Sequence, residues 1–316
     1  MYDVVTIGES MITFSPCNKE PLQFASTFGK KVGGAELNVA IGCARLGLKS
    51  GWISRLGNDD FGRYILNFAR GEGVDVSQVE LVDEYPTSLN FKEVLPDGTT
   101  KTIYYRHKSP VLTLEPEHID ENYIKQAKIL HLTGIYPAID RKNIAVMEKA
   151  IDIARKYNVK VSLDPNIRLR MWSEEEAREV LQQLLPKVDI LLAGDAEMEI
   201  IIGEKEPAKI FAALEKYHIS FIAVKQGEKG SVGCQHGIIA EAPAIPAKKV
   251  VDTVGAGDGY NAGIMYGLLH DWPLERTLTF GNAIGSIVVS VYGDNEGLPT
   301  YEQVLETMGE KEFIER

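Results

Sequence analysis

A short segment near the C-terminus places two glycines between two acids. It reads Asp252-Thr253-Val254-Gly255-Ala256-Gly257-Asp258, and an apolar run with helical spacing follows it. Because glycine has no Cβ, the backbone at Gly255 and Gly257 can take positive φ and lie close to a ligand. N–H groups of Gly255, Ala256 and Gly257 at a helix N-terminus can converge on an anionic oxygen. The segment predicts an anion hole with Asp258 as a base beside it. The alternative is a tight turn in which Asp258 only caps the helix.

A second glycine cluster near the N-terminus makes this pattern more specific. It reads Gly33-Gly34-Ala35-Glu36-Leu37-Asn38 and opens a run with helical spacing that extends to Leu46. The two clusters, in this order and at this separation, resemble the two signatures of the ribokinase-like (PfkB) family of carbohydrate kinases. The resemblance covers essentially the whole chain.

Two other glycine motifs that bind phosphate do not fit. A P-loop requires Gly-x-x-x-x-Gly-Lys-Ser/Thr, which no window of the chain supplies. A dinucleotide fingerprint has a third glycine where Tyr260 stands, and it belongs to the first strand–helix turn of its domain. The sequence therefore favours phosphoryl transfer over hydride transfer.

The resemblance implies a role for each part of the motif. Asp258 would be the catalytic base, and the backbone of Gly255, Ala256 and Gly257 would form the anion hole. Asp252 would stabilise the loop and a nearby ion. ATP with Mg²⁺ would be the phosphate donor, and a monovalent cation is left open as a further cofactor.

The expected nucleotide and metal residues lie elsewhere in the chain. Gly194-Asp195-Ala196-Glu197 matches a family motif except that Gly194 replaces an Asn; Glu197 would order Mg²⁺ through water, or else is only a charge at a helix start. For Asn282, buried helix packing is the alternative. The residues expected to bind the cofactors are Lys225, Gly227, Gly230 and Asn282 for the nucleotide and Glu197 for the metal.

Two arginines bear on the substrate. Arg168 follows a strand, at the edge where open α/β sheets bind ligands, and Arg106 ends a hairpin. Two guanidinium groups at one pocket indicate a carboxylate on the substrate; the alternative for Arg106 is an ion pair with a surface acid. The chain resembles the 2-keto-3-deoxygluconate kinases of the family more than the ribokinases, fructokinases or adenosine kinases. That resemblance implies a substrate site of Gly33, Gly34, Asn38, Tyr104, Arg106, Arg168 and Asp294, although some members carry an aromatic residue at the position of Asn90.

These residues predict ATP-dependent phosphorylation of 2-keto-3-deoxygluconate to 2-keto-3-deoxy-6-phosphogluconate. A fructokinase or another PfkB sugar kinase is the nearest alternative. A non-catalytic sugar-binding protein on the same fold is the alternative from another class. An intact Asp258 argues against it, because binding alone needs no base.

The elements that must position these residues alternate along the chain. Strands are expected at 4–8, 50–56, 129–132, 159–163, 190–193 and 221–224, and helices at 35–46, 61–70, 143–157, 173–185, 208–216, 258–269 and 274–291. Ser173 with Glu176, and Thr300 with Gln303, form capping-box patterns at two helix starts. This alternation predicts a parallel sheet with helices on both faces.

The resemblance refines this to a ribokinase-like three-layer α/β/α sandwich with a mostly parallel central sheet and a small β-sheet lid. Residues 1–316 would form a single kinase domain, with lid segments at about 12–28 and 87–106. The second segment contains a hairpin that turns at Pro96-Asp97-Gly98. Lids of this kind often pair with the lid of a second subunit, which predicts a homo-oligomer.

Composition limits the partners. The chain has 316 residues, 44% of them hydrophobic, and 34 Lys and Arg against 45 Asp and Glu give a net charge of −11. An acidic protein is a poor ligand for nucleic acid or an anionic membrane. The N-terminus lacks a signal-peptide pattern, and the three cysteines are widely spaced, which predicts a cytoplasmic protein without a disulfide framework or zinc site. The expected partners are small molecules, a sugar acid and ATP.

Overall fold

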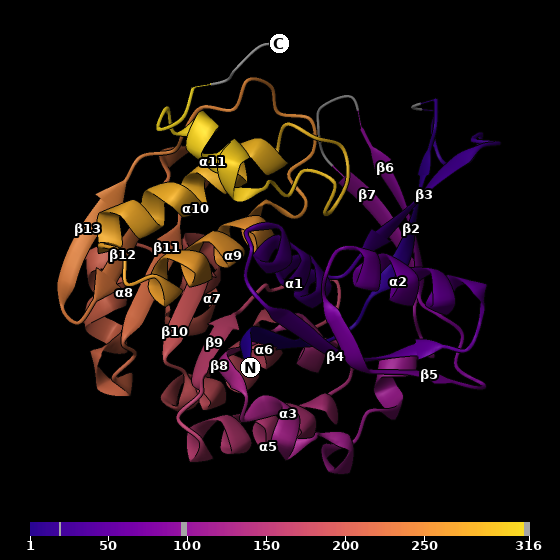
Figure 1. The fold of residues 1–316 in the computed structure, drawn as a ribbon, viewed down its shortest axis with the longest axis horizontal. Coiled ribbons are helices and arrows are strands. Elements are labelled where there is room, and N and C mark those ends of the chain that lie inside the picture. Colours follow the sequence, from indigo (N-terminus) through magenta and orange to yellow (C-terminus); the bar gives the residue numbers. More distant parts are fainter. Residues whose placement is uncertain (19, 96–99, 313–316) are drawn as a thin grey trace.

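The computed structural model describes residues 1–18, 20–95 and 100–312, and its strands form two separate sheets (Figure 1). The larger sheet lies in the order β13-β12-β11-β10-β9-β8-β1-β4-β5 and is parallel from β5 to β11, with β12 and β13 antiparallel. Its strands are β1 (Tyr2–Ile7), β4 (Ser50–Gly57), β5 (Asp75–Val82), β8 (Ala127–Thr133), β9 (Lys160–Asp164), β10 (Ile190–Gly194), β11 (Phe221–Lys225), β12 (Ser231–Gln235) and β13 (Ile238–Ala242).

Helices cover both faces of this sheet, so the molecule has three layers (Figure 1). The helices are α1 (Ala35–Arg45), α2 (Asp60–Gly71), α3 (Glu121–Ile124), α4 (Ile135–Ile139), α5 (Asn143–Lys156), α6 (Glu174–Leu184), α7 (Asp195–Ile202), α8 (Pro207–Leu214), α9 (Ala256–Leu269), α10 (Leu274–Val288) and α11 (Tyr301–Thr307). Residues of α1, α2, α9 and α10 share one buried apolar cluster with the sheet, and residues of α5 to α8 share the other.

Period-two alternation along the strands explains the two cores. Val4 packs in the cluster with α1 and α9, whereas Val5 and Ile7 pack in the cluster with α5 and α6. Strands buried on both faces have nearly continuous apolar sequences, as a parallel sheet between two helix layers requires. The expected α/β/α sandwich is confirmed.

The second sheet is the lid sheet, with strands in the order β3-β2-β6-β7 (upper right in Figure 1). Its strands are β2 (Met11–Pro16), β3 (Phe28–Gly33), β6 (Leu89–Val94) and β7 (Thr100–Tyr105). β6 and β7 pair antiparallel, but the expected turn at Pro96-Asp97-Gly98 lies outside the described residues. Aromatic rings fill one face of the lid sheet: Phe91 lies 5.4 Å from Phe14 and 5.8 Å from Tyr105, centroid to centroid.

The helix starts marked by capping boxes agree with expectation, whereas several other boundaries differ. Both capping boxes are present, at Ser173 and at Thr300. Helix α9 begins at Ala256, two residues before the expected start, and α10 ends at Val288 rather than at residue 291. Strands β5, β12 and β13 of the larger sheet were not expected. β5 lies at the edge of the sheet, and its partly exposed residues show no clean alternation.

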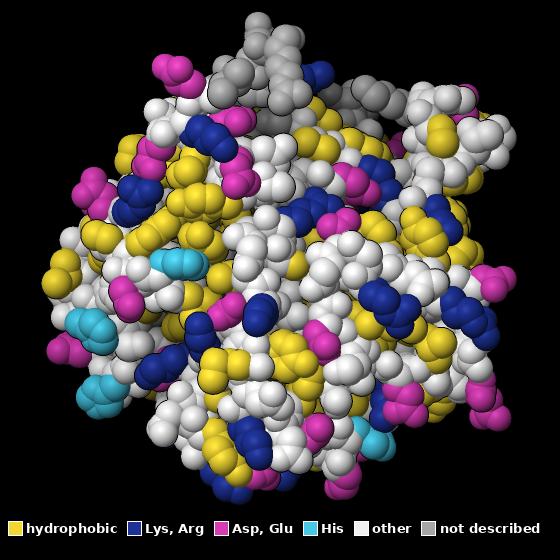
Figure 2. Space-filling view, in the orientation of Figure 1, with side chains coloured by type: hydrophobic (Ala, Val, Ile, Leu, Met, Phe, Trp, Pro, Cys, Tyr) yellow, Lys and Arg dark blue, Asp and Glu magenta, His cyan; other side chains and the backbone are white. Residues whose placement is uncertain are grey.

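The surface agrees with the mixed composition. Figure 2 shows basic and acidic side chains interspersed over one face of the molecule. In the part of the chain that the structure describes, no helix is both long enough and apolar enough to cross a membrane.

Candidate active site

Two cavities adjoin at the N-terminus of α9. The first, of ≈ 620 Å³, lies between the lid sheet and the carboxyl ends of the central strands. The second, of ≈ 660 Å³, lies beside β11 and α10. Lys225, Thr253 and Gly257 line both cavities, so a ligand in one can meet a ligand in the other at this point.

Gly255 makes the turn that starts α9. Its φ of +81° is left-handed, and a Cβ there would lie 1.9 Å from the backbone oxygen of Asp294. Glycine is therefore required at this position by both conformation and space. The expectation of positive φ at Gly257 is wrong, because this residue already lies inside the helix. A Cβ on Gly257 would point into the shared region and would lie 3.7 Å from Lys225 Nζ.

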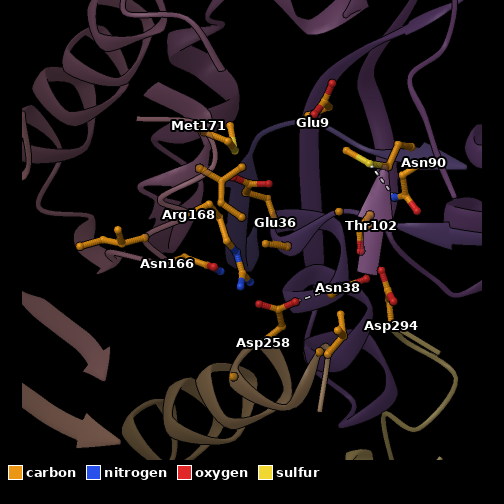
Figure 3. Close-up of a pocket in the computed structure, with 18 of the residues that line it drawn as sticks. Glu9, Glu36, Asn38, Asn90, Thr102, Asn166, Arg168, Met171, Asp258 and Asp294 are labelled. Carbon is orange, nitrogen blue, oxygen red and sulfur yellow. Dashed lines mark hydrogen bonds between the residues drawn. The ribbon is translucent and has the colours of Figure 1, made fainter. Parts of the chain in front are cut away.

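Asp258 lies in the first turn of α9, lines the first cavity and is 8% exposed. Asn38 Nδ2 donates a hydrogen bond to its Oδ2 at 2.8 Å (Figure 3). Burial raises the pKa of Asp258 to about 7, even though Asn38 and the nearby Arg168 and Lys225 favour the ionised form. A carboxylate with such a pKa can both accept and release a proton near neutral pH.

Asn38 was expected among the substrate residues, and the structure shows what its side chain contacts. Its Nδ2 bonds to Asp258, and its Oδ1 accepts from Asn295 Nδ2 at 3.3 Å. Asn38 is 2% exposed. These contacts fix the Asp258 carboxylate relative to the start of α1.

A buried charge network lies behind Asp258. Lys225 Nζ donates to Asp164 Oδ2 at 3.0 Å, and Asn261 Nδ2 donates to the same oxygen at 2.6 Å. The Asp164 carboxylate and the Glu197 carboxylate raise the pKa of Lys225, outweighing the opposite effect of its burial. Lys225 therefore carries a positive charge where the two cavities meet.

Both oxygens of Glu197 accept backbone hydrogen bonds. Oε2 accepts from Gly194 N at 2.7 Å, and Oε1 accepts from Ile167 N at 2.8 Å. The first bond caps α7, and the second fixes the chain next to Arg168. Burial, with the nearby Asp164 carboxylate, raises the pKa of Glu197. These contacts are those of an acid at a helix start, which was the alternative to a role in ordering Mg²⁺.

Arg106 and Arg168 both line the first cavity, and Arg106 Nη2 also lies 2.9 Å from Met171 Sδ, in the segment that carries Arg168. Arg168 extends toward Asp258 (Figure 3). Arg106 Nη1 lies 3.2 Å from Glu9 Oε2, and its guanidinium carbon lies 5.0 Å from the centre of the Tyr104 ring. The partner of Arg106 is thus a buried acid inside the cavity, which corrects the surface-acid alternative.

The remaining substrate candidates lie close together. Asp294 lines the first cavity, and its Oδ2 would lie 2.6 Å from a Cβ on Gly33. Gly34, with φ +139°, also lines the cavity, and a Cβ there would meet the backbone oxygen of Glu9 at 2.5 Å. Gly33 and Gly34 therefore let Asp294 and the strand-end residue Glu9 approach the start of α1.

The second cavity contains the expected nucleotide residues. Gly227, Gly230 and Asn282 line it together with apolar residues of the 244–250 segment. Gly230 takes φ +101°, and a Cβ there would lie 2.2 Å from the Ala242 oxygen. Asn282 Nδ2 donates to Ala242 O at 2.9 Å, and its Oδ1 accepts from Ser231 Oγ at 3.1 Å. The amide of Asn282 thus joins α10 to the edge strands.

Five charged residues of the first cavity were not among the expected site residues: Glu9, Glu36, Lys92, Asp164 and Arg170. Glu9 follows β1, so the strand-end rule that located Arg168 could have found it. Lys92 alternates with Phe91 and Glu93 on β6 and shares the cavity face with Asn90. Glu36 is fully buried, and desolvation raises its pKa to about 8. No pattern in the sequence distinguishes it from an exposed helix-start acid.

Within residues 1–18, 20–95 and 100–312, no three His, Cys, Asp or Glu side chains are grouped as a metal site. Glu197 and Asp164 line the first cavity close to Lys225, and they already bind backbone N–H groups, an amide and Lys225.

Comparison with known proteins gives a consistent result. The family model "pfkB family carbohydrate kinase" matches residues 1–301. The chain is 38% identical to a 2-dehydro-3-deoxygluconokinase of Bacillus subtilis (strain 168), covering 96% of this chain and 94% of that protein. It is 32% identical to a 5-dehydro-2-deoxygluconokinase of Geobacillus thermodenitrificans, with 96% and 91% covered. The crystal structure of a Thermotoga maritima 2-dehydro-3-deoxygluconokinase superposes with a TM-score of 0.90 at 25% identity, covering 98% of each chain.

Proposed function

The chain belongs to the pfkB family of carbohydrate kinases, and we propose that it transfers the γ-phosphoryl group of ATP to 2-keto-3-deoxygluconate, giving 2-keto-3-deoxy-6-phosphogluconate. 2-Dehydro-3-deoxygluconate is another name for the same sugar acid. Kinases of this family use ATP with Mg²⁺.

The observation that carries the proposal is the meeting of two cavities at the start of α9. One cavity is polar and contains Asp258, and the other has the glycines and apolar wall suited to a nucleotide. A sugar hydroxyl beside Asp258 would face a γ-phosphate beside Gly257 and Lys225. This arrangement supports in-line phosphoryl transfer between two ligands.

In the proposed reaction, Asp258 accepts the proton of the attacking hydroxyl. The hydroxyl oxygen forms a bond to the γ-phosphorus, the bond to the β-phosphate oxygen breaks, and ADP leaves. First-turn N–H groups of a helix lack carbonyl partners within the helix, so those at residues 255–257 can bind the transferring oxygens; Ala256 N would give up its long 3.4 Å bond to Thr253 O. Lys225 adds a fixed positive charge. The lid sheet excludes water from the reacting groups.

Mg²⁺ would enter with the nucleotide rather than bind to a preformed protein cluster. Mg²⁺ prefers a few carboxylates, several waters and substrate phosphates, and the described residues near the junction offer Asp164 and Glu197. These carboxylates would hold the ion through water, and the ion would neutralise phosphate charge. Each oxygen of Glu197 already accepts a backbone hydrogen bond, which favours contact with the ion through water.

The arginines and the relatives both favour an acidic sugar. Arg106 and Arg168 line the cavity that would hold the acceptor. The two relatives described above are both named as kinases of keto-deoxy sugar acids. A carboxylate on the substrate would share Arg106 with Glu9, whose Oε2 is only 3.2 Å from the guanidinium. 5-Dehydro-2-deoxygluconate is the second candidate acceptor.

A coupled ADP-release assay across keto-sugar acids and neutral ketoses tests the acceptor. We expect the highest kcat/KM for 2-keto-3-deoxygluconate, and an Arg106→Leu variant should raise its KM at least about tenfold, because a charge-assisted pair is lost. Activity on fructose should barely change. The Glu9→Gln/Arg106→Leu double variant is the matched control, because Arg106→Leu alone leaves Glu9 buried without its cation. A preference for fructose in the wild type, or equal losses on both substrates in the double variant, would contradict the sugar-acid proposal.

We also propose that residues 1–316 act as one kinase domain and that it forms a homo-oligomer through the lid sheet. β7 is an edge strand of that sheet. Ile103 and Tyr105 on β7 are 42% and 56% exposed, and Tyr105 packs against Phe91 on the face away from the first cavity. An exposed edge strand with apolar side chains supports pairing with a second copy.

A further inference from the structure

A lysine of the lid sheet reaches the turn that starts α9. Lys92 lies on β6, and its Nζ is 2.7 Å from Asp252 Oδ2 and 2.9 Å from Asp294 Oδ1. The Lys92 side chain is 5% exposed and the Asp252 side chain is 0% exposed. This ion pair therefore joins residues 160 positions apart in the sequence, one in the lid and one in the glycine-rich motif.

Asp252 through its carboxylate and Asp294 through its backbone both support the anion-binding turn. Asp252 Oδ1 accepts from Val254 N at 3.2 Å, and its Oδ2 accepts from Gly293 N at 3.3 Å. The backbone oxygen of Asp294 lies against Gly255, where a Cβ would meet it at 1.9 Å. Movement of either residue would displace the N–H groups at the start of α9.

These carboxylates need a positive charge, because two anions buried side by side repel each other. Burial alone would lower the pKa of Lys92, but the carboxylates of Asp294 and Asp252 raise it above its ordinary value. Lys92 therefore stays an ammonium ion. The neighbouring lid lysine, Lys31, instead contacts the Tyr292 oxygen and lies 3.6 Å from Glu296 Oε1.

A free monovalent cation beside Asp252 would have to compete with Lys92 Nζ. The Oδ2 atom that would bind it already contacts Lys92 Nζ, and the Oδ1 atom already accepts from Val254 N. An ammonium group and a monovalent metal ion carry the same charge, so Lys92 can neutralise Asp252 as a bound ion would.

We propose that Lys92 is a positioning residue whose ammonium group serves as a built-in cation for Asp252 and Asp294, holding the anion hole in place and making turnover independent of added monovalent cations. The inference rests on the proposed kinase function. It also couples the lid sheet to the anion hole, because the cation is carried by a lid strand.

The first test uses the wild-type protein. Its kcat should be the same, within about twofold, when K⁺ or NH₄⁺ is replaced by tetramethylammonium at constant ionic strength. Stimulation by K⁺ of tenfold or more would overturn the proposal. If no sugar or sugar acid is phosphorylated at all, the proposed function fails, and the Lys92 proposal is then decided by the thermal measurements below.

The second test removes the charge. Lys92→Ala and the similarly sized Lys92→Met should lower kcat at least about tenfold with little change in KM for ATP. In Lys92→Ala, ammonium or propylammonium should restore part of kcat and raise Tm, because either ion can occupy the vacated site beside Asp252. Tetramethylammonium is too large and should do neither. Lys92→Arg should retain more activity than Lys92→Met.

Lys31→Ala is the matched control, because it removes a lid lysine that contacts the same loop but neither Asp252 nor Asp294. Its Tm and kcat should not respond to ammonium. A Lys92→Met variant that raises only the KM for the sugar, with kcat unchanged, would show instead that Lys92 contacts the substrate. Identical ammonium responses in wild type, Lys31→Ala and Lys92→Ala would equally overturn the proposal.

Discussion

Asp258 has the properties that a general base needs at neutral pH. Burial raises its pKa to about 7, whereas Asn38 holds the carboxylate in one orientation. A lower pKa would make the carboxylate a weak proton acceptor, and a higher pKa would leave it protonated. The pKa of Asp258 is thus set by the burial of its carboxyl group inside the cavity.

The first prediction concerns this carboxylate. Asp258→Asn keeps the shape but cannot accept the proton, so kcat should fall by about 10²–10⁴-fold. The wild-type kcat/KM should fall as pH decreases through about 7, because protonation of Asp258 removes the base. Steady-state assays from acid to alkaline pH measure both effects. Asp60→Asn, at an exposed acid that begins α2, is the control and should change neither.

The Asp258→Asn variant should not be less stable than the wild type at alkaline pH. A carboxyl group whose folded pKa exceeds its unfolded value binds protons more readily when folded, so its ionisation lowers the free energy of unfolding as pH rises. Asp258 imposes this cost fully only above about pH 7. The Tm of Asp258→Asn at pH 8 should therefore equal or exceed that of the wild type. A large loss of Tm would mean that the kinetic defect reports unfolding rather than a lost base.

The sequence could identify Asp258 but not its environment. Its place in a glycine motif predicts a base, whereas its pKa depends on burial and on Asn38 and Asp164, which lie far away in the chain. The same applies to Lys92, whose contacts with Asp252 and Asp294 exist only after the lid strand has folded over α9. Residue type and local spacing do not encode such contacts.

At the scale of elements, the start of α9 separates two glycines that look alike in the sequence. Gly255 caps the helix with positive φ, and Gly257 lies inside the first turn. Only the structure distinguishes them, because helix boundaries from sequence are uncertain by a few residues. Helices and strands with strong apolar patterns were predictable, whereas the partly exposed edge strand β5 was not.

The different positions of Gly255 and Gly257 in α9 lead to the second prediction. Gly255→Ala forces Cβ against the Asp294 oxygen and into an unfavourable φ, so both Tm and kcat should fall. Gly257→Ala puts Cβ in open space 3.7 Å from Lys225 Nζ and favours the helix, so Tm should be equal to or above that of the wild type. Its kcat should nevertheless fall at least about tenfold, because the methyl group enters the phosphate path. Thermal melts and turnover of the two variants, side by side, measure this. Equal losses of Tm in both would mean that Gly257 is also structurally required.

At the scale of the whole molecule, the proposed homo-oligomer would connect substrate binding to assembly through the lid sheet. Thr102 and Tyr104 on β7 line the first cavity, Tyr104 with 45% of its surface exposed, and they alternate with the exposed Ile103 and Tyr105. Because side chains alternate along a strand, one face of the lid can contact the sugar acid while the other contacts a second copy. A partner subunit would then restrict lid motion and hold Arg106 over the cavity.

The last prediction tests this connection. Ile103→Glu places a charge on the outer face of β7, so light scattering coupled to size-exclusion chromatography should show a smaller species than the wild type. The KM for the sugar acid should rise, because a lid without a partner would hold Tyr104 and Arg106 less firmly. Ile239→Glu is the matched control: Ile239 is 54% exposed on β13, an edge strand of the other sheet. It should change neither the mass nor the KM. A wild-type protein that is monomeric at assay concentration would contradict the role of a partner subunit. The lid would then stay closed over the substrate through its own contacts, foremost that of Lys92 with Asp252.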